Sequence, residues 1–312
     1  MAISPAHSSA GTLVISSGLH GVEGFFGSAV QVALLERWRL APPRVRCVLL
    51  HALNPFGFAW LRRTDERNVD LNRNFLLDGE PFAGAPPGYA ALDPVLNPAD
   101  AASASRSLFF GLLPSLIRRG VGDVRRAVAV GQYEFPRGLF FGGAAPTPAR
   151  VAIERVMRFS IIGAASVVHL DVHTGLGKWS VGQLLIDYAI ADEQRERMVR
   201  GFGAERIRMA ASDLAYTARG GFGGWCVSAG LAEEYLFAYA EFGTFSGVRV
   251  LSGLRAENHA HHWLAADDPA AIRAKQRLKD LFFPRDAAWR SRTIDQAVEL
   301  TQRAERILMT AT

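Results

Sequence analysis

Thr12-Leu-Val-Ile-Ser-Ser17-Gly-Leu-His20-Gly-Val-Glu23 predicts a strand followed by a helix near the start of the chain. Residues 12–17 form a short, apolar and β-prone run, which is typical of a buried strand. From residue 23 to residue 38 the apolar side chains recur at helical spacing. His20 and Glu23 are therefore expected on the turn between strand and helix. In open α/β sheets, ligands bind at this end of a strand.

The rest of the chain repeats the alternation of strands and helices. Apolar runs predict further strands at residues 45–50, 165–172, 183–190 and 236–241. Helical spacing predicts helices at residues 108–130, 148–159, 268–281 and 293–309. Residues 78–98 are rich in Gly and Pro and predict a surface excursion within one domain. The expected fold class is α/β, with a mixed, mostly parallel twisted sheet covered by helices on both faces.

The composition favours one globular domain over residues 1–312. The 312 residues are 49% hydrophobic, which is enough for one large core. The net charge is +5, but the basic residues are nearly all arginines and are scattered among acidic ones. A nucleic-acid-binding surface would need basic residues gathered on one face, so we do not expect a nucleic-acid partner.

Cysteine content and hydropathy indicate a cytoplasmic protein. Cys47 and Cys226 are too few for a disulfide framework, and we expect both to be reduced core residues. The first residues lack the pattern of a secretory signal, and no run approaches the roughly 18 apolar residues of a membrane span. We therefore expect no membrane partner.

Two imidazoles and a carboxylate are supplied by His20, Glu23 and His173, the last within Asp171-Val-His173-Thr-Gly-Leu-Gly177. A catalytic zinc uses this ligand set when it keeps a fourth position open for water. We expect one zinc ion per chain. Glu241 ends an apolar run, where a general base would be useful.

A polar loop, Asp70-Leu-Asn72-Arg73-Asn-Phe75, supplies an amide and a guanidinium side by side. Asn72 and Arg73 suit a substrate carboxylate, which they can hold through planar, charge-assisted hydrogen bonds. Asp171 could orient the imidazole of His173, although alternation along a strand equally permits a structural role.

The other histidines have plainer explanations. His259, His261 and His262 look like a metal cluster, but adjacent and alternate residues point in different directions on a helix or a strand. We expect a rim position or a hydrogen-bonded cluster there instead of a second metal site. His51 and His169 lie in apolar strands and are expected to be core histidines.

The motifs together resemble one known superfamily, that of the zinc metallocarboxypeptidases, which includes the aspartoacylase and succinylglutamate desuccinylase branch. A bacterial family of carboxypeptidase-like proteins within it is the nearest in motifs, and the resemblance spans residues 12–263. The matching motifs are His20-Gly-Val-Glu23-Gly, Asn54-Pro-Phe-Gly, Val69-Asp-Leu-Asn-Arg-Asn-Phe75, Gly131-Gln-Tyr, Leu139-Phe-Phe-Gly-Gly143, Asp171-Val-His-Thr-Gly-Leu-Gly177 and Glu241-Phe-Gly-Thr244.

The resemblance implies a zinc carboxypeptidase-like fold and a role for each matching residue. His20, Glu23 and His173 correspond to the zinc ligands. Glu241 corresponds to the general base that activates water and then protonates the leaving amine. In the family the first motif follows several dozen more residues, so we expect either a start further upstream or a sheet that lacks an edge.

The substrate-binding residues are implied in the same way. Asn72 and Arg73 match the pair that grips the terminal carboxylate of a peptide or acyl amino acid. Arg63, or failing that Arg62, matches the arginine that stabilises the oxyanion. Tyr216 lies in about the right region for the tyrosine that carboxypeptidases place over the substrate, although the alignment there is loose.

The function implied is zinc-dependent hydrolysis of an amide bond next to a free carboxylate. A carboxypeptidase and a small-molecule N-acyl amino acid deacylase both fit, and an ester substrate is also chemically open. A non-catalytic binding protein is the alternative of another class, but it would have no need for Glu241. The expected partner is a small-molecule or peptide substrate with a carboxylate, and a homo-oligomer stays open.

Overall fold

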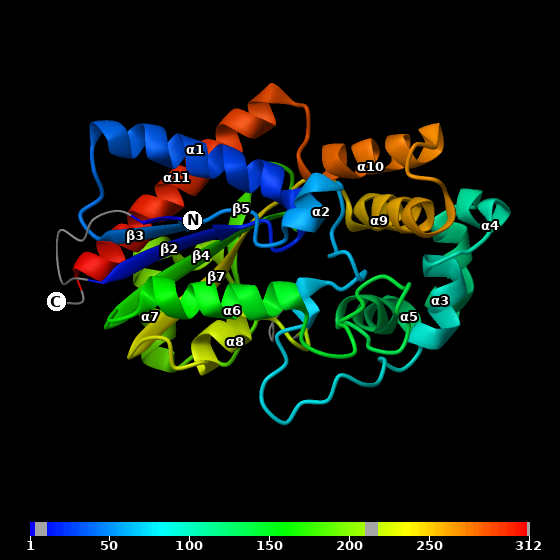
Figure 1. Ribbon diagram of the computed structural model, residues 1–312, viewed down its shortest axis with the longest axis horizontal. Coiled ribbons are helices and arrows are strands. Elements are labelled where there is room, and N and C mark those ends of the chain that lie inside the picture. Colours follow the sequence, from blue (N-terminus) through cyan, green and yellow to red (C-terminus); the bar gives the residue numbers. More distant parts are fainter. Residues whose placement is uncertain (4–10, 210–217, 311–312) are drawn as a thin grey trace.

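The computed structural model describes residues 1–3, 11–209 and 218–310, and its strands form a single mixed sheet (Figure 1). The order across the sheet is β1 (Ala2–Ile3), β3 (Arg46–Leu50), β2 (Thr12–Ser17), β4 (Ser166–Thr174), β7 (Glu234–Phe242), β5 (Gly182–Ile186) and β6 (Ile207–Met209). The four central strands β3, β2, β4 and β7 are parallel, whereas β1 and β5 run antiparallel to their neighbours β3 and β7. The mixed, mostly parallel sheet confirms the predicted fold class.

Helices cover both faces of this sheet and extend beyond it. The helices are α1 (Gly24–Leu40), α2 (Pro55–Ala59), α3 (Tyr89–Leu96), α4 (Ala101–Ser105), α5 (Leu108–Ala129), α6 (Pro148–Ile161), α7 (Asp192–Phe202), α8 (Phe222–Ser228), α9 (Gly247–Trp263), α10 (Pro269–Phe282) and α11 (Ala287–Met309). Short 3₁₀ turns lie at η1 (Gly21–Glu23), η2 (Leu71–Arg73) and η3 (Ala204–Arg206).

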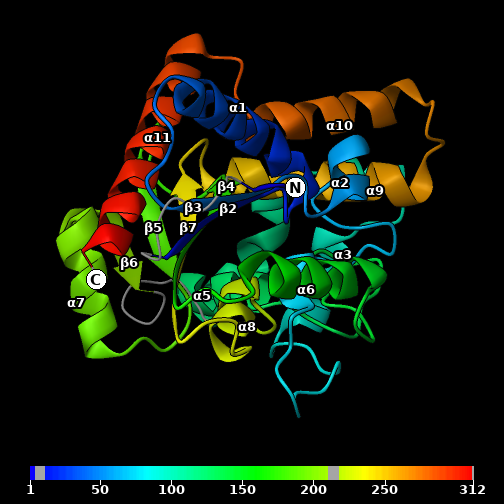
Figure 2. The ribbon, with the colours of Figure 1, turned by 60° about the vertical axis from the view of Figure 1, so that its left-hand side comes forward.

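Alternating strand residues build a core on each face of the sheet. On one face Leu13 and Ile15 pack with side chains of α1 and α11, and on the other Val14 packs with side chains of α6 and α8. Figures 1 and 2 show these pairs of helices on opposite sides of the strands. The period-2 alternation of β2 therefore supplies apolar side chains to both layers.

A third cluster of apolar side chains joins α3, α5, α9 and α10 beyond the sheet. It corrects the prediction of a surface excursion at residues 78–98, because Tyr89, Leu92 and Leu96 of α3 are buried in it. Their spacing of three and four residues places them on one face of the helix. The surrounding Gly and Pro residues concealed that spacing.

Three expectations about buried residues can be compared with the structure. Cys47 and Cys226 are buried free thiols, and His169 is fully buried, as predicted. His51 is exposed and contacts the hydroxyl of Ser28, so the prediction of a core position was wrong. It directly follows β3, where the chain has already left the core. In the described part of the chain, no helix is long and apolar enough to cross a bilayer.

Candidate metal centre

The sheet gathers residues from distant parts of the sequence at the carboxyl ends of its parallel strands. His173 near the end of β4 lies beside Glu241 near the end of β7 in the strand register. On the other side of β4, strand β2 ends at Ser17 and leads through His20 into η1, which contains Glu23. The topology therefore brings together the ligands and the base that the sequence suggested.

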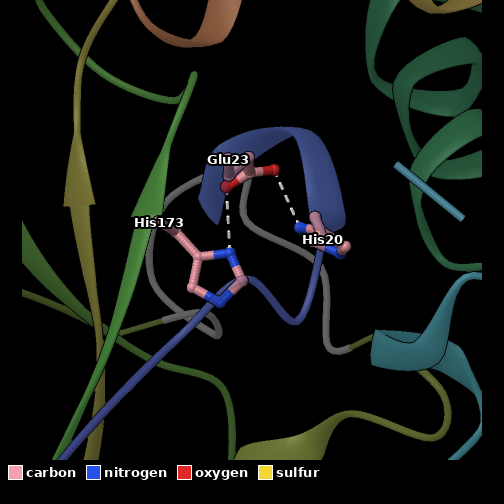
Figure 3. A group of neighbouring side chains, drawn as sticks. All are labelled: His20, Glu23 and His173. Carbon is pink, nitrogen blue, oxygen red and sulfur yellow. Dashed lines mark hydrogen bonds and ion pairs between the residues drawn. The ribbon is translucent and has the colours of Figure 1, made fainter. Parts of the chain in front are cut away.

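His20, Glu23 and His173 form a compact, buried group (Figure 3). The ligand atoms of the three side chains lie within 4.8 Å of one another. The Nδ1 atom of His20 lies 2.8 Å from one carboxylate oxygen of Glu23, and the Nδ1 atom of His173 lies 3.1 Å from the other. Among the described residues, this is the one group of three or more potential ligands close enough to hold a metal ion.

The outer nitrogen of each imidazole faces an aspartate. Nε2 of His20 lies 3.1 Å from Asp70, and Nε2 of His173 lies 2.6 Å from Asp171. Histidines that bind metals commonly donate their other N–H to a carboxylate, which fixes the tautomer and the ring orientation. Both Nδ1 atoms are thereby left to face Glu23, so the donor set fits a zinc ion. Asp171 thus contacts the predicted ligand His173.

Close backbone packing fixes the turn that carries His20 and Glu23. A Cβ atom on Gly21 would lie 2.0 Å from the carbonyl carbon of Gly57, so η1 can approach α2 only with glycine at this position. Asn54 caps α2 by accepting a hydrogen bond from the backbone N–H of Gly57 at 2.8 Å. The motif Asn54-Pro-Phe-Gly57 therefore supports the turn without contributing a ligand.

Glu241 has a carboxylate oxygen available for chemistry. Its Oε2 atom is buried and has no hydrogen-bond partner among the residues the structure describes. Burial raises the pKa of Glu241 to about 7, and the nearby charge of Glu23 adds to this while His173 and Arg63 oppose it. For Glu23, burial alone would raise the pKa, but the neighbouring His20 and His173 hold it below its usual value.

The two adjacent arginines have different environments. Arg63 donates to Asp70 at 2.9 Å and lies 3.4 Å from Glu23, so its guanidinium borders the metal group. Arg62 is fully buried in another network and donates to Glu257 at 2.9 Å. The structure thus places Arg62 away from the site, which corrects its assignment as a substrate-binding candidate and leaves Arg63 as the cation near Glu241.

Tyr239, which was not among the predicted site residues, links Asn72 to the candidate ligand His173. The hydroxyl of Tyr239 donates to Oδ1 of Asn72 at 3.0 Å, and the tyrosine ring packs on His173 with centroids 5.4 Å apart. Arg73 is buried, and its carbonyl accepts a hydrogen bond from Tyr133 of the glycine-rich loop. Tyr239 could have been found from strand alternation, because it shares a face of β7 with Glu241.

The remaining predicted residues lie elsewhere. On α9, the Nδ1 atom of His259 lies 2.9 Å from the carbonyl oxygen of Pro98. Among the described residues, no group of side chains around His261 or His262 could hold a metal ion. Tyr216 falls outside the described residues. Nothing in the structure therefore supports a second metal site in this part of the chain.

One family model and several solved structures match this chain. The mixed sheet and the buried His–Glu–His group agree with the fold and the ligand set that the resemblance implied. The chain belongs to the family described as "Protein of unknown function (DUF2817)", whose model matches residues 1–296. No curated protein matches the sequence.

Several solved structures of low identity are also similar. Carboxypeptidase A from Helicoverpa armigera is 14% identical, with 87% of this chain and 61% of that chain covered and a TM-score of 0.40. Succinylglutamate desuccinylase from Chromobacterium violaceum is 14% identical, with 90% and 63% covered and a TM-score of 0.41. Murein-tripeptide amidase MpaA from Escherichia coli O157 is 19% identical, with 88% and 84% covered and a TM-score of 0.41. This chain thus spans about three fifths of the first two, and at these scores none of them is a basis for assigning an activity.

Proposed function

We propose that this protein is a zinc-dependent hydrolase of an amide bond, peptide or N-acyl, that lies next to a free carboxylate. The observation that carries the proposal is the pairing of a three-residue ligand group with Glu241, whose buried Oε2 has no hydrogen-bond partner among the described residues. A purely structural metal site is usually closed by four protein ligands and needs no adjacent base. Three ligands next to such a base match the requirements of hydrolysis.

His20, Glu23 and His173 would hold one zinc ion per chain. When bound, zinc supplies a Lewis acid and lowers the pKa of coordinated water to about 7. The nearby charge of Glu23 helps to raise the pKa of Glu241, and a divalent cation bound beside the two carboxylates would offset this repulsion.

The remaining polar residues have complementary roles in the proposed reaction. Glu241 would take a proton from the attacking water and return it to the leaving nitrogen. Arg63, beside Glu23 and Asp70, would stabilise the negative charge that develops on the substrate oxygen. Asn72 and Arg73 would hold the substrate carboxylate, which selects bonds next to a free acid.

The direct test combines metal analysis with a substrate panel. Purified protein loaded with zinc would be incubated with short peptides, N-acyl amino acids and the corresponding esters, each supplied with a free and an amidated carboxylate. We expect about one zinc per chain and hydrolysis of the free acids only. Zinc binding without hydrolysis of any class would favour a binding protein, whereas equal hydrolysis of amidated substrates would remove the carboxylate from the proposal.

The expected location and partners of the protein are also part of this proposal. We expect the protein to act in the cytoplasm on a small molecule or peptide, with neither nucleic acid nor membrane as a partner. The substrate panel tests the expected kind of substrate, because it shows whether the site accepts a small molecule or requires a peptide.

A further inference from the structure

A chain of buried hydrogen bonds leads away from the candidate metal ligand His173 into the sheet. Asp171 contacts Nε2 of His173 with one oxygen and the hydroxyl of Ser16 with the other, both at 2.6 Å. The Ser16 hydroxyl also lies 2.6 Å from Nε2 of His169, whose Nδ1 lies 2.9 Å from the hydroxyl of Tyr235. All five side chains are buried.

The strand register explains why these side chains meet. His169, Asp171 and His173 alternate along β4 and so project from the same face. Ser16 of β2 is paired directly with Asp171 across the parallel ladder. The polar row therefore results from three residues at alternate positions of one strand and one residue of its neighbour.

The donors and acceptors of this chain can be assigned without conflict. Ser16 has a single hydroxyl proton, which it donates to Asp171, so Nε2 of His169 must donate to Ser16. Nδ1 of His169 is then the acceptor for Tyr235. This pattern requires a neutral imidazole, and burial lowers the pKa of His169 to about 4. Every hydrogen bond thus points toward Asp171, which receives protons from both sides.

We propose that Ser16 and His169 are positioning residues that tune the affinity of the metal centre by fixing Asp171 behind His173. A carboxylate held by donors on both sides has one orientation, and it holds the imidazole in the tautomer that leaves Nδ1 free for a metal. Loss of such an outer partner typically weakens metal binding by about 10- to 100-fold. The inference rests on the metal site of the proposed function.

A role in core packing alone would give a different result. His169 also makes edge contacts with the rings of Phe222 and Phe237, so its removal could lower stability through packing. A loss of packing, however, would not by itself change zinc affinity. It also would not make the effect of a His169 substitution depend on the presence of Ser16. Zinc affinity and thermal stability therefore separate the two roles.

The experiment measures the zinc dissociation constant by competition with a chelator, together with the melting temperature, for Ser16→Ala, His169→Leu and the double variant. We expect each single variant to weaken zinc binding measurably, by less than the roughly 10- to 100-fold that loss of the outer partner Asp171 itself would cause. The double variant should be no weaker than Ser16→Ala, because His169 acts only through Ser16. His169→Gln, whose amide can still donate to Ser16, should restore most of the affinity.

His259→Leu is the matched control, since it removes another buried imidazole, whose Nδ1 atom lies 2.9 Å from the carbonyl oxygen of Pro98. We expect it to leave zinc affinity unchanged. Unchanged affinity in Ser16→Ala, or fully additive losses in the double variant, would overturn the inference while leaving the metal site intact. If the wild-type protein binds no zinc, the proposed function itself fails, and the inference fails with it. Should His169→Leu not fold, Ser16→Ala removes a single atom and decides the matter alone.

Discussion

At the scale of single residues, the proposed function assigns metal binding and proton transfer to different side chains. The candidate ligands His20, Glu23 and His173 form one group, whereas one carboxylate oxygen of Glu241 on β7 has no hydrogen-bond partner in the described part of the chain. These side chains come from three separate segments of the chain. Substitutions should therefore remove one role at a time.

Glu241→Gln preserves the shape of the side chain and removes its basic oxygen. We expect zinc content to be unchanged and kcat to fall by about 10²- to 10⁴-fold, the usual contribution of a general base. Both quantities are measured on the same preparation, with Glu23→Gln as the control that should lose zinc. A near-normal kcat would exclude Glu241 from the mechanism, and loss of zinc would make it a ligand.

The raised pKa of Glu241 also predicts how the metal-free protein responds to pH. Folding raises this pKa from an ordinary value of 4.5 to about 7. The folded state therefore binds the proton of Glu241 more tightly than the unfolded state does. This proton's contribution to the free energy of unfolding is fully present below pH 4.5 and is lost as the pH rises through about 7. Relative to Glu241→Gln, the chelator-treated protein should lose stability across this range. A constant difference in melting temperature would contradict the prediction.

Arg73→Ala should mainly affect substrate binding. A lost charge-assisted pair with the substrate carboxylate raises KM for free-acid substrates, and the melting temperature should change little by comparison. The matched measurement uses the same substrate with its carboxylate amidated. An equal loss on both forms would show that Arg73 does not recognise that group.

At the scale of elements, the site depends on the contact between η1 and α2. Gly21→Ala would place a Cβ atom 2.0 Å from the backbone of Gly57, so the turn carrying His20 and Glu23 would have to move. We expect a loss of about 1–3 kcal/mol in the free energy of unfolding, together with weaker zinc binding.

Gly224→Ala in α8 provides the control for this change. A Cβ atom there has nothing within 4 Å, and alanine favours a helix over glycine by up to about 1 kcal/mol. Denaturant unfolding of the metal-free proteins should therefore show opposite signs for the two substitutions. Equal effects would mean that the close approach at Gly21 does not constrain the turn.

At the scale of the whole molecule, a metal bound between η1 and β4 should link folding to zinc. A ligand that binds only the folded state stabilises it by RT ln(1 + [L]/Kd), or about 4 kcal/mol at a thousandfold excess over Kd. We expect chelator to lower the melting temperature and added zinc to restore it. His173→Ala should abolish this dependence and His261→Ala should retain it. The reverse pattern would move the metal to the histidines of α9.

Much of this fold could be predicted from local sequence. Strands β2, β3, β4 and β7 are apolar runs, and α1, α5, α6, α10 and α11 have helical spacing, so pattern alone was sufficient. Helix α9 was missed because its buried face is largely polar and includes Arg255, Glu257 and Asn258. Its burial depends on partners such as Arg62, which are far away in the sequence.

The sequence by itself determined which side chains could bind a metal, their order and the strand ends near which they lie, because these follow from side-chain chemistry and short-range periodicity. Only the tertiary structure decided that Arg63 and not Arg62 borders the metal group, and that Asp70, Asp171 and Tyr239 support it. Adjacent residues have the same local pattern, so their directions are set by packing against elements elsewhere in the chain. Likewise, Ser16 and His169 meet only because β2 and β4 are paired in this register.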